Sequence, residues 1–170
     1  MYHVREIKSN EYKKLGELLV EVYSKLKGFP GPDKIPDYYD NLLNIHQFLE
    51  SPKTKIFVVV DKDEKLQGGV VYFGDMQYYG AGTEKTHQQK AAAFRFLAVN
   101  PSARGKGLAK LLVSQCFHQA RAEGFKKLMI HSTAYMKDAI NMYKKMGFER
   151  FKYIDFVKNG VKVFGYNYEL

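Results

Sequence analysis

The chain has 170 residues, 45% of them hydrophobic and 26% charged, which suits one globular domain over residues 1–170 and is short for two. A single cysteine excludes an internal disulfide, and the scattered histidines predict no metal site; without an apolar signal region or a membrane-length run, we expect a cytoplasmic protein with no membrane partner. The net charge of +9 comes mainly from lysines spread along the chain, so we do not expect nucleic acid as a partner.

The first half of the chain predicts a strand, two helices and a hairpin. Hydrophobic alternation indicates strands, apolar residues three and four apart indicate helices, and Pro and Gly mark the boundaries. In chain order we expect a strand at 2–7, a helix from the N-cap Ser9 to before Gly28 and an irregular segment at 29–36. These are followed by a second helix that begins at Pro36, carries Phe48 and is stopped by Ser51 and Pro52, by hairpin strands at 56–60 and 69–73, and by a polar loop at 75–90.

The second half predicts alternating strands and helices that end in a hairpin. In chain order we expect a strand at 91–99, a helix at 108–122 capped by Gly124, a strand at 128–131, a helix at 136–146, and strands at 148–156 and 161–168 joined by a type I′ turn at Asn159 and Gly160. Hairpins combined with one crossover predict an α/β (α+β) fold, a mixed sheet with helices on both faces.

The stretch 91–110 carries the strongest functional signal, because an apolar strand there meets a basic turn that opens directly into a helix. Such a turn presents backbone N–H groups at the positive end of a helix dipole, an arrangement that binds phosphate. Gly107 allows a phosphate to approach the backbone, Arg104 can pair with phosphate oxygens, and Lys106 adds a mobile charge. The Walker and dinucleotide motifs are excluded because the glycines that they need are missing.

The spacing Arg104-x-x-Gly107-x-Ala109 resembles the (Gln/Arg)-x-x-Gly-x-(Gly/Ala) motif of the GNAT family, the Gcn5-related N-acetyltransferases. The resemblance implies that the turn holds the pyrophosphate of acetyl-CoA, the cosubstrate. It also implies a mostly antiparallel sheet splayed between its fourth and fifth strands, where pantetheine amides pair with the backbone of the fourth strand. The cofactor-binding residues implied in this way are Leu97, Val99, Arg104, Gly105, Lys106, Gly107 and Ala109.

The predicted helix at 136–146 supports the same resemblance. Ala139, Tyr143, Gly147 and Phe148 form the pattern Ala-x-x-x-Tyr-x-x-x-Gly-Phe, which resembles the late helix and following strand of GNAT enzymes. The resemblance implies that the Tyr143 hydroxyl lies near the sulfur of CoA and protonates the leaving thiolate. From the residues alone, a tyrosine on an apolar helix face such as Tyr143 is usually a core residue with its hydroxyl satisfied.

Two positions depart from the family pattern. Many members carry Asn where this chain has Met136, and some carry a Glu that acts as general base where it has Ala93. Without that Glu, the group that takes the proton from the amine stays open among Asp75, Glu84, His87, His131 and a water relay.

The expected acceptor pocket is aromatic, which suits an apolar or cationic amine. Its candidate lining residues are Phe29, Tyr38, Tyr39, Tyr78, Tyr79 and Tyr135. We therefore expect an N-acetyltransferase that moves an acetyl group from acetyl-CoA to a primary amine of a small molecule or protein. The alternatives are a catalytically silent acyl-CoA-binding module and, on net charge alone, a basic nucleic-acid-binding domain; a homodimer is left open.

Overall fold

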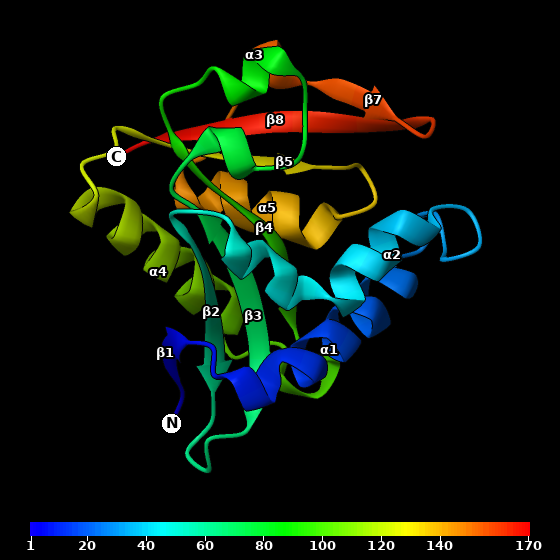
Figure 1. Ribbon diagram of the computed structural model, residues 1–170, viewed down its shortest axis with the longest axis vertical. Coiled ribbons are helices and arrows are strands. Elements are labelled where there is room, and N and C mark those ends of the chain that lie inside the picture. The colour runs from blue at the N-terminus through cyan, green and yellow to red at the C-terminus, as the bar shows by residue number, and fades with distance from the viewer.

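The computed structural model describes residues 1–170 and is built around a mixed, eight-stranded sheet (Figure 1). Its strand order is β1-β2-β3-β4-β5-β8-β6, with β7 paired to the remaining part of β8. All neighbouring strands are antiparallel except β4 and β5. The strands are β1 (His3–Glu6), β2 (Thr54–Val60), β3 (Leu66–Phe73), β4 (Ala92–Val99), β5 (Lys127–Ser132), β6 (Glu149–Arg150), β7 (Phe156–Lys158) and β8 (Val161–Glu169).

Helices cover both faces of this sheet, which confirms the predicted fold class (Figure 1). The helices are α1 (Tyr12–Ser24), α2 (Pro36–Leu43), α3 (Glu84–His87), α4 (Leu108–Ala122) and α5 (Lys137–Met146). One hydrophobic cluster joins α1 and α2 to one face of the sheet, and a second cluster joins α4 and α5 to the other face. None of these helices has the length and apolar character needed to cross a membrane.

The central strands are almost unbroken apolar runs because both of their faces are buried. Residues 56–60 of β2 and 68–73 of β3 are buried without alternation. Even-numbered residues of β2 pack toward α1, and Phe57 and Val59 pack toward α4. Burial on both faces fixes the register of these strands, because a one-residue slip would exchange the two sets of side chains.

The second predicted helix is wrong in its length. The α-helix ends at Leu43, and residues Ile45–Glu50 continue as a 3₁₀ helix. The break lies at Asn44, whose backbone leaves the helical region and whose side-chain amide donates to the carbonyl of Asp40 at 3.0 Å. Asn favours such local hydrogen bonds, which compete with helix continuation.

The predicted strand at 148–156 is also wrong, because a 3₁₀ turn at Lys152–Ile154 separates β6 from β7. Gly165 on β8 permits this turn: a Cβ at that position would lie 2.2 Å from Cγ1 of Ile154. The side chain of Ile154 is fully buried there. The predicted hairpin after β7 is confirmed, with Asn159 at φ 52° and Gly160 at φ 74°, as a type I′ turn requires.

Candidate active site

The sheet opens between β4 and β5. These parallel strands pair only at Ala92 with Leu128 and at Ala93 with Met129. From Phe94 onward the edge of β4 that faces β5 has no strand partner, so its backbone groups remain available to a ligand. The predicted splay between the fourth and fifth strands is therefore confirmed.

A β-bulge in β4 lies within this opening. Val71 of β3 pairs with Arg95 and Gly69 pairs with Ala98, so two residues of β4 stand opposite Val70. Phe96 sits in the left-handed region at φ 59°, which is costly for a bulky residue. The bulge interrupts the alternation of side chains and brings Arg95 and Phe96 to the same cavity.

The predicted phosphate turn lies between β4 and α4. Gly105 and Gly107 have φ angles of 78° and 76°, and a Cβ at either position would meet no atom within 4 Å. The backbone N–H groups from Gly105 to Lys110 donate to no protein acceptor, since the first N–H of α4 that finds a partner is that of Leu111. A run of free N–H groups at the start of a 15-residue helix is an anion-binding arrangement.

The side chains of the turn differ in their surroundings. Arg104 is exposed and Ala109 is half-buried. The Lys106 ammonium donates to the hydroxyl of Tyr2 at 3.1 Å and lies 5.7 Å from the centre of that ring. Tyr2 therefore holds Lys106 toward the N-terminal strand, whereas Arg104 is free to face a ligand.

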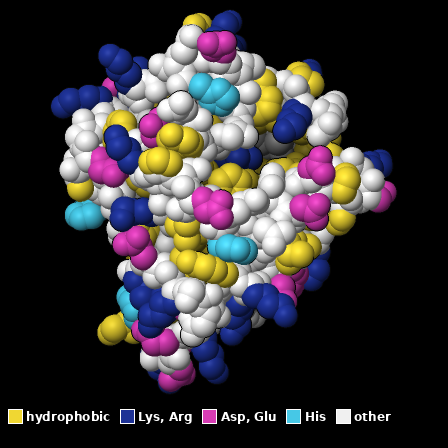
Figure 2. Space-filling view, in the orientation of Figure 1, with side chains coloured by type: hydrophobic (Ala, Val, Ile, Leu, Met, Phe, Trp, Pro, Cys, Tyr) yellow, Lys and Arg dark blue, Asp and Glu magenta, His cyan; other side chains and the backbone are white.

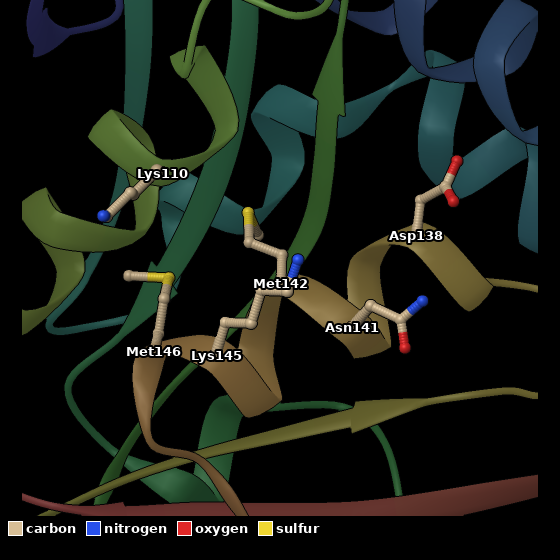
Figure 3. Close-up of a pocket in the computed structure, with 6 residues that line it drawn as sticks. All are labelled: Lys110, Asp138, Asn141, Met142, Lys145 and Met146. Atoms are coloured by element: carbon tan, nitrogen blue, oxygen red, sulfur yellow. The ribbon is translucent and has the colours of Figure 1, made fainter.

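A groove of about 450 Å³ runs from the first turn of α4 along α5 (Figure 3). Lys110 extends from α4, and Met142 and Met146 project from α5 into the space between the two helices (Figure 3). Asp138, Asn141 and Lys145 complete the lining. The groove adjoins the free N–H groups through Lys110, so a ligand bound at the turn can continue along it.

The predicted pantetheine-binding residues lie at the splayed edge. Leu97 and Val99 are half-buried and pack toward the α4 side of the sheet. The carbonyl oxygen of Leu97 accepts a hydrogen bond from the hydroxyl of Tyr23 at 3.1 Å. This bond ties α1 to the unpaired part of β4.

Tyr143 lies on the buried face of α5, where its side chain is 6% exposed. Its ring packs edge-on against Phe94 of β4 at 5.8 Å and against Phe148 at 5.6 Å, measured between ring centres. Burial raises the pKa of the Tyr143 hydroxyl well above its usual value, so the group keeps its proton at neutral pH. The contact with Phe94 places the Tyr143 ring beside the first residue of β4 that has no partner in β5.

A cavity of about 660 Å³ occupies the α1 and α2 side of the opening. Figure 2 shows it as a hollow right of centre, with basic and apolar surface inside. Of the six predicted aromatic residues, Phe29, Tyr38 and Tyr79 line it. Tyr39, Tyr78 and Tyr135 do not, although Tyr135 contacts Phe29 with 6.3 Å between ring centres.

Among the candidate bases, only His131 lines this cavity. Asp75 caps a short 3₁₀ helix through the N–H of Gln77, and Glu84 and His87 are exposed on α3. Ala93 is fully buried in the core. No cluster of three or more His, Cys, Asp or Glu side chains forms a candidate metal site.

His131 is held by two hydrogen bonds that fix its tautomer. Its Nε2 lies 2.7 Å from the carbonyl oxygen of Ile154, which can only accept, so Nε2 carries the proton. Its Nδ1 then accepts from the hydroxyl of Tyr79 at 2.9 Å. Burial lowers the pKa of His131 to about 4, so the ring is neutral at pH 7.

The depressed pKa of His131 predicts a pH-dependent stability. Between pH 6.5 and about 4 the unfolded chain binds a proton at this residue and the folded chain does not, so stability falls as pH falls through this window. The loss is at most about 3 kcal/mol. Urea unfolding of the wild type and of His131→Gln at pH 6.5 and 4.5 measures it. An equal loss in both proteins would contradict a neutral His131.

Arg95, Phe96 and Thr133 are cavity residues that the sequence did not predict. Thr133 follows β5, is 5% exposed, and its hydroxyl is the one buried side-chain polar atom without a partner. All three residues line the cavity. The bulge that presents Arg95 and Phe96 depends on how β3 pairs with β4, and no local sequence signal marks it.

A mixed sheet of this strand order, splayed after its fourth strand, is the fold of solved GNAT-family acetyltransferases onto which this chain superposes. The chain belongs to the acetyltransferase (GNAT) family, whose model matches residues 15–148. The predicted membership of the GNAT family is thereby confirmed.

Relatives and solved structures agree with this assignment. The chain is 35% identical over 113 residues to the uncharacterized N-acetyltransferase YjgM of Escherichia coli, a match that covers 66% of this chain and 62% of the relative. The chain thus spans less than two thirds of that curated relative. A GNAT-family acetyltransferase from Staphylococcus aureus superposes with a TM-score of 0.73 at 15% identity, covering 100% of this chain and 99% of the other. Spermidine N-acetyltransferase from Vibrio cholerae, solved with CoA and spermine, has a TM-score of 0.65 at 15% identity, with coverages of 99% and 95%.

Proposed function

We propose that this protein transfers an acetyl group from acetyl-CoA to a primary amine of a small molecule or protein in the cytoplasm. The observation that carries the proposal is the run of free N–H groups from Gly105 to Lys110, in the turn that follows β4. The aromatic cavity lies against the same strand, on the α1 and α2 side of the opening between β4 and β5. The turn offers an anion site and the cavity offers room for an acceptor. A thioester held along the edge of β4 would lie between them.

The residues of the turn fit acetyl-CoA because they combine free hydrogen-bond donors with open space. In the proposal, N–H groups from Gly105 to Lys110 hold the pyrophosphate, and the absence of Cβ atoms at the two glycines lets phosphate oxygens approach the backbone. Lys110 and Lys145 add positive charge to the adjoining groove. The backbone at Leu97 and Val99 pairs with the pantetheine amides.

Four roles are needed for acetyl transfer, and the chain offers groups for three of them. Holding amine and thioester together supplies several kcal/mol of the barrier. A backbone N–H on the unpaired edge of β4 polarises the thioester carbonyl as its oxygen gains charge. The Tyr143 hydroxyl, protonated at neutral pH, donates to the sulfur as the thiolate leaves.

The fourth role, accepting the amine proton, falls to water, because burial lowers the pKa of His131 to about 4 and makes its ring a weak base. Deprotonating a lysine-like amine at pH 7 costs about 4–5 kcal/mol, so assistance matters. No carboxylate replaces the missing Glu at buried Ala93, and both ring nitrogens of His131 are engaged. The lack of a general base favours one alternative function, that of a catalytically silent acyl-CoA-binding module.

A two-part experiment tests the proposal. Acetyl-CoA at about 100 times its Kd should stabilise the fold by about 2.7 kcal/mol in a thermal shift assay. A library of primary amines should then include acceptors that release free CoA. Stabilisation without CoA release would support the silent module, and no stabilisation at millimolar acetyl-CoA would exclude both functions.

Arg104→Ala should weaken CoA binding about three- to tenfold and leave binding of phosphate-free pantetheine unchanged. The guanidinium is exposed and pairs with phosphate, while the backbone donors remain, so the defect is partial. Lys106→Ala is the matched control and should have a smaller effect, because that ammonium is held by Tyr2. Calorimetric titration measures both ligands. An equal loss for CoA and pantetheine would show that Arg104 does not act on phosphate.

A further inference from the structure

Arg95 differs from the other partly buried arginines of this chain. Arg5 pairs with Glu11 at 2.7 Å, and Arg150 pairs with Asp155 at 2.7 Å, each through two guanidinium nitrogens. Arg95 is partly buried as well, yet its one hydrogen bond within the protein goes from Nη1 to the backbone carbonyl of Tyr79 at 2.9 Å. A partly buried guanidinium without a carboxylate is costly unless a ligand supplies one.

The contacts of Arg95 hold it in place for such a ligand. Its guanidinium lies 4.2 Å from the ring centre of Phe96 and 5.6 Å from that of Tyr79. These cation–π contacts and the bond to the Tyr79 carbonyl fix the planar group, while the remaining N–H donors have no protein acceptor. The bulge sets Arg95 in the lining of the acceptor cavity.

The charges around the cavity agree with an anionic ligand. Lys34, Arg95 and Lys158 line it, and Asp37 is the one carboxylate among the lining residues. Thr133 adds an unpartnered buried hydroxyl to the same lining. Such a surface repels a polycation and attracts a carboxylate.

We infer that the acceptor is a primary amine that also carries a carboxylate, as an apolar amino acid does, and that Arg95 binds this carboxylate. The inference rests on the proposed function, since it names the substrate class of that site. Arginine suits the role because its fork of donors matches the two oxygens of a carboxylate. The aromatic residues Tyr23, Phe29 and Tyr38 then pack against the apolar part of the acceptor.

Matched pairs of amines test this inference. L-phenylalanine and L-methionine are compared with their primary amides, which keep the amine and lose the anionic charge. The acids should be preferred at least tenfold in kcat/KM for CoA release, mainly through KM. Arg95→Met should remove the preference, and Arg95→Lys should restore part of it. Arg121→Met, which removes an exposed guanidinium on α4 outside the cavity lining, is the control and should retain the preference.

A binding measurement separates this inference from the proposed function. Thermal shifts with the same pairs, in the presence of CoA, require no turnover. The acids should stabilise the wild type and not Arg95→Met, even if no amine is acetylated. Equal stabilisation by acids and amides, no stabilisation by either, or a preference for spermidine would overturn the assignment of Arg95 as a carboxylate site.

Discussion

Replacing Tyr143 by Phe is expected to lower turnover about 10²-fold while the Kd for acetyl-CoA stays nearly unchanged. The ring packs against Phe94 and Phe148, and Phe preserves these contacts. Loss of a proton donor to a leaving group costs on the order of 10²–10⁴ in rate. We expect the lower end, because the raised pKa of this hydroxyl makes it a weak acid that acts chiefly by hydrogen bonding to the thiolate.

Tyr72→Phe provides the matched control for this prediction. Tyr72 is buried in the same hydrophobic cluster, and its hydroxyl bonds to Glu123 at 2.6 Å. This change should affect stability and leave turnover intact. If Tyr143→Phe turns over like the wild type with an accepted amine, Tyr143 is a packing residue, and water or Thr133 must supply the proton.

A side chain at Gly107 should abolish most cofactor affinity. Gly107→Leu places a Cβ where a phosphate would approach the free N–H groups, and losing two charge-assisted hydrogen bonds should raise the Kd for acetyl-CoA about 10²- to 10³-fold. The left-handed backbone adds a folding cost of about 1–2 kcal/mol. Calorimetric titration of the folded variant gives the Kd.

The control for Gly107 lies at the other end of the same helix. Gly124 has φ 81° and, as at Gly107, a Cβ added there would meet no atom within 4 Å. Gly124→Leu should therefore lose similar stability and bind acetyl-CoA normally. Similar affinities for the two variants would show that the turn before α4 does not hold the phosphates.

The sequence revealed those parts of the site that depend on local chemistry. The glycines of the phosphate turn, the helix cap at Gly147 and the type I′ turn at Gly160 each follow from a backbone conformation that few residues tolerate, and all four glycines have positive φ angles. The same reasoning located α4 and α5 closely, because both carry an apolar face and a clear end. Helix ends and tight turns can therefore be predicted from neighbouring residues alone.

Features that depend on distant pairing could not be predicted. The bulge at Phe96 arises from the register of β4 against β3. The 3₁₀ turn before Asp155 exists because Gly165, on another strand, leaves room for Ile154. That turn also supplies the carbonyl that fixes the tautomer of His131. The turn that we propose binds the cofactor is therefore encoded locally, whereas the cavity that we propose binds the acceptor is built by tertiary contacts.

The most direct test of the account is an amide NMR titration of the ¹⁵N-labelled protein with CoA. We predict that the N–H resonances from Gly105 to Lys110 shift on binding, because those groups are free in the protein and face the phosphates in the complex. The N–H resonances of Gly124 and Gly160 should stay in place. Saturation with CoA that leaves the resonances from Gly105 to Lys110 unchanged would contradict the account.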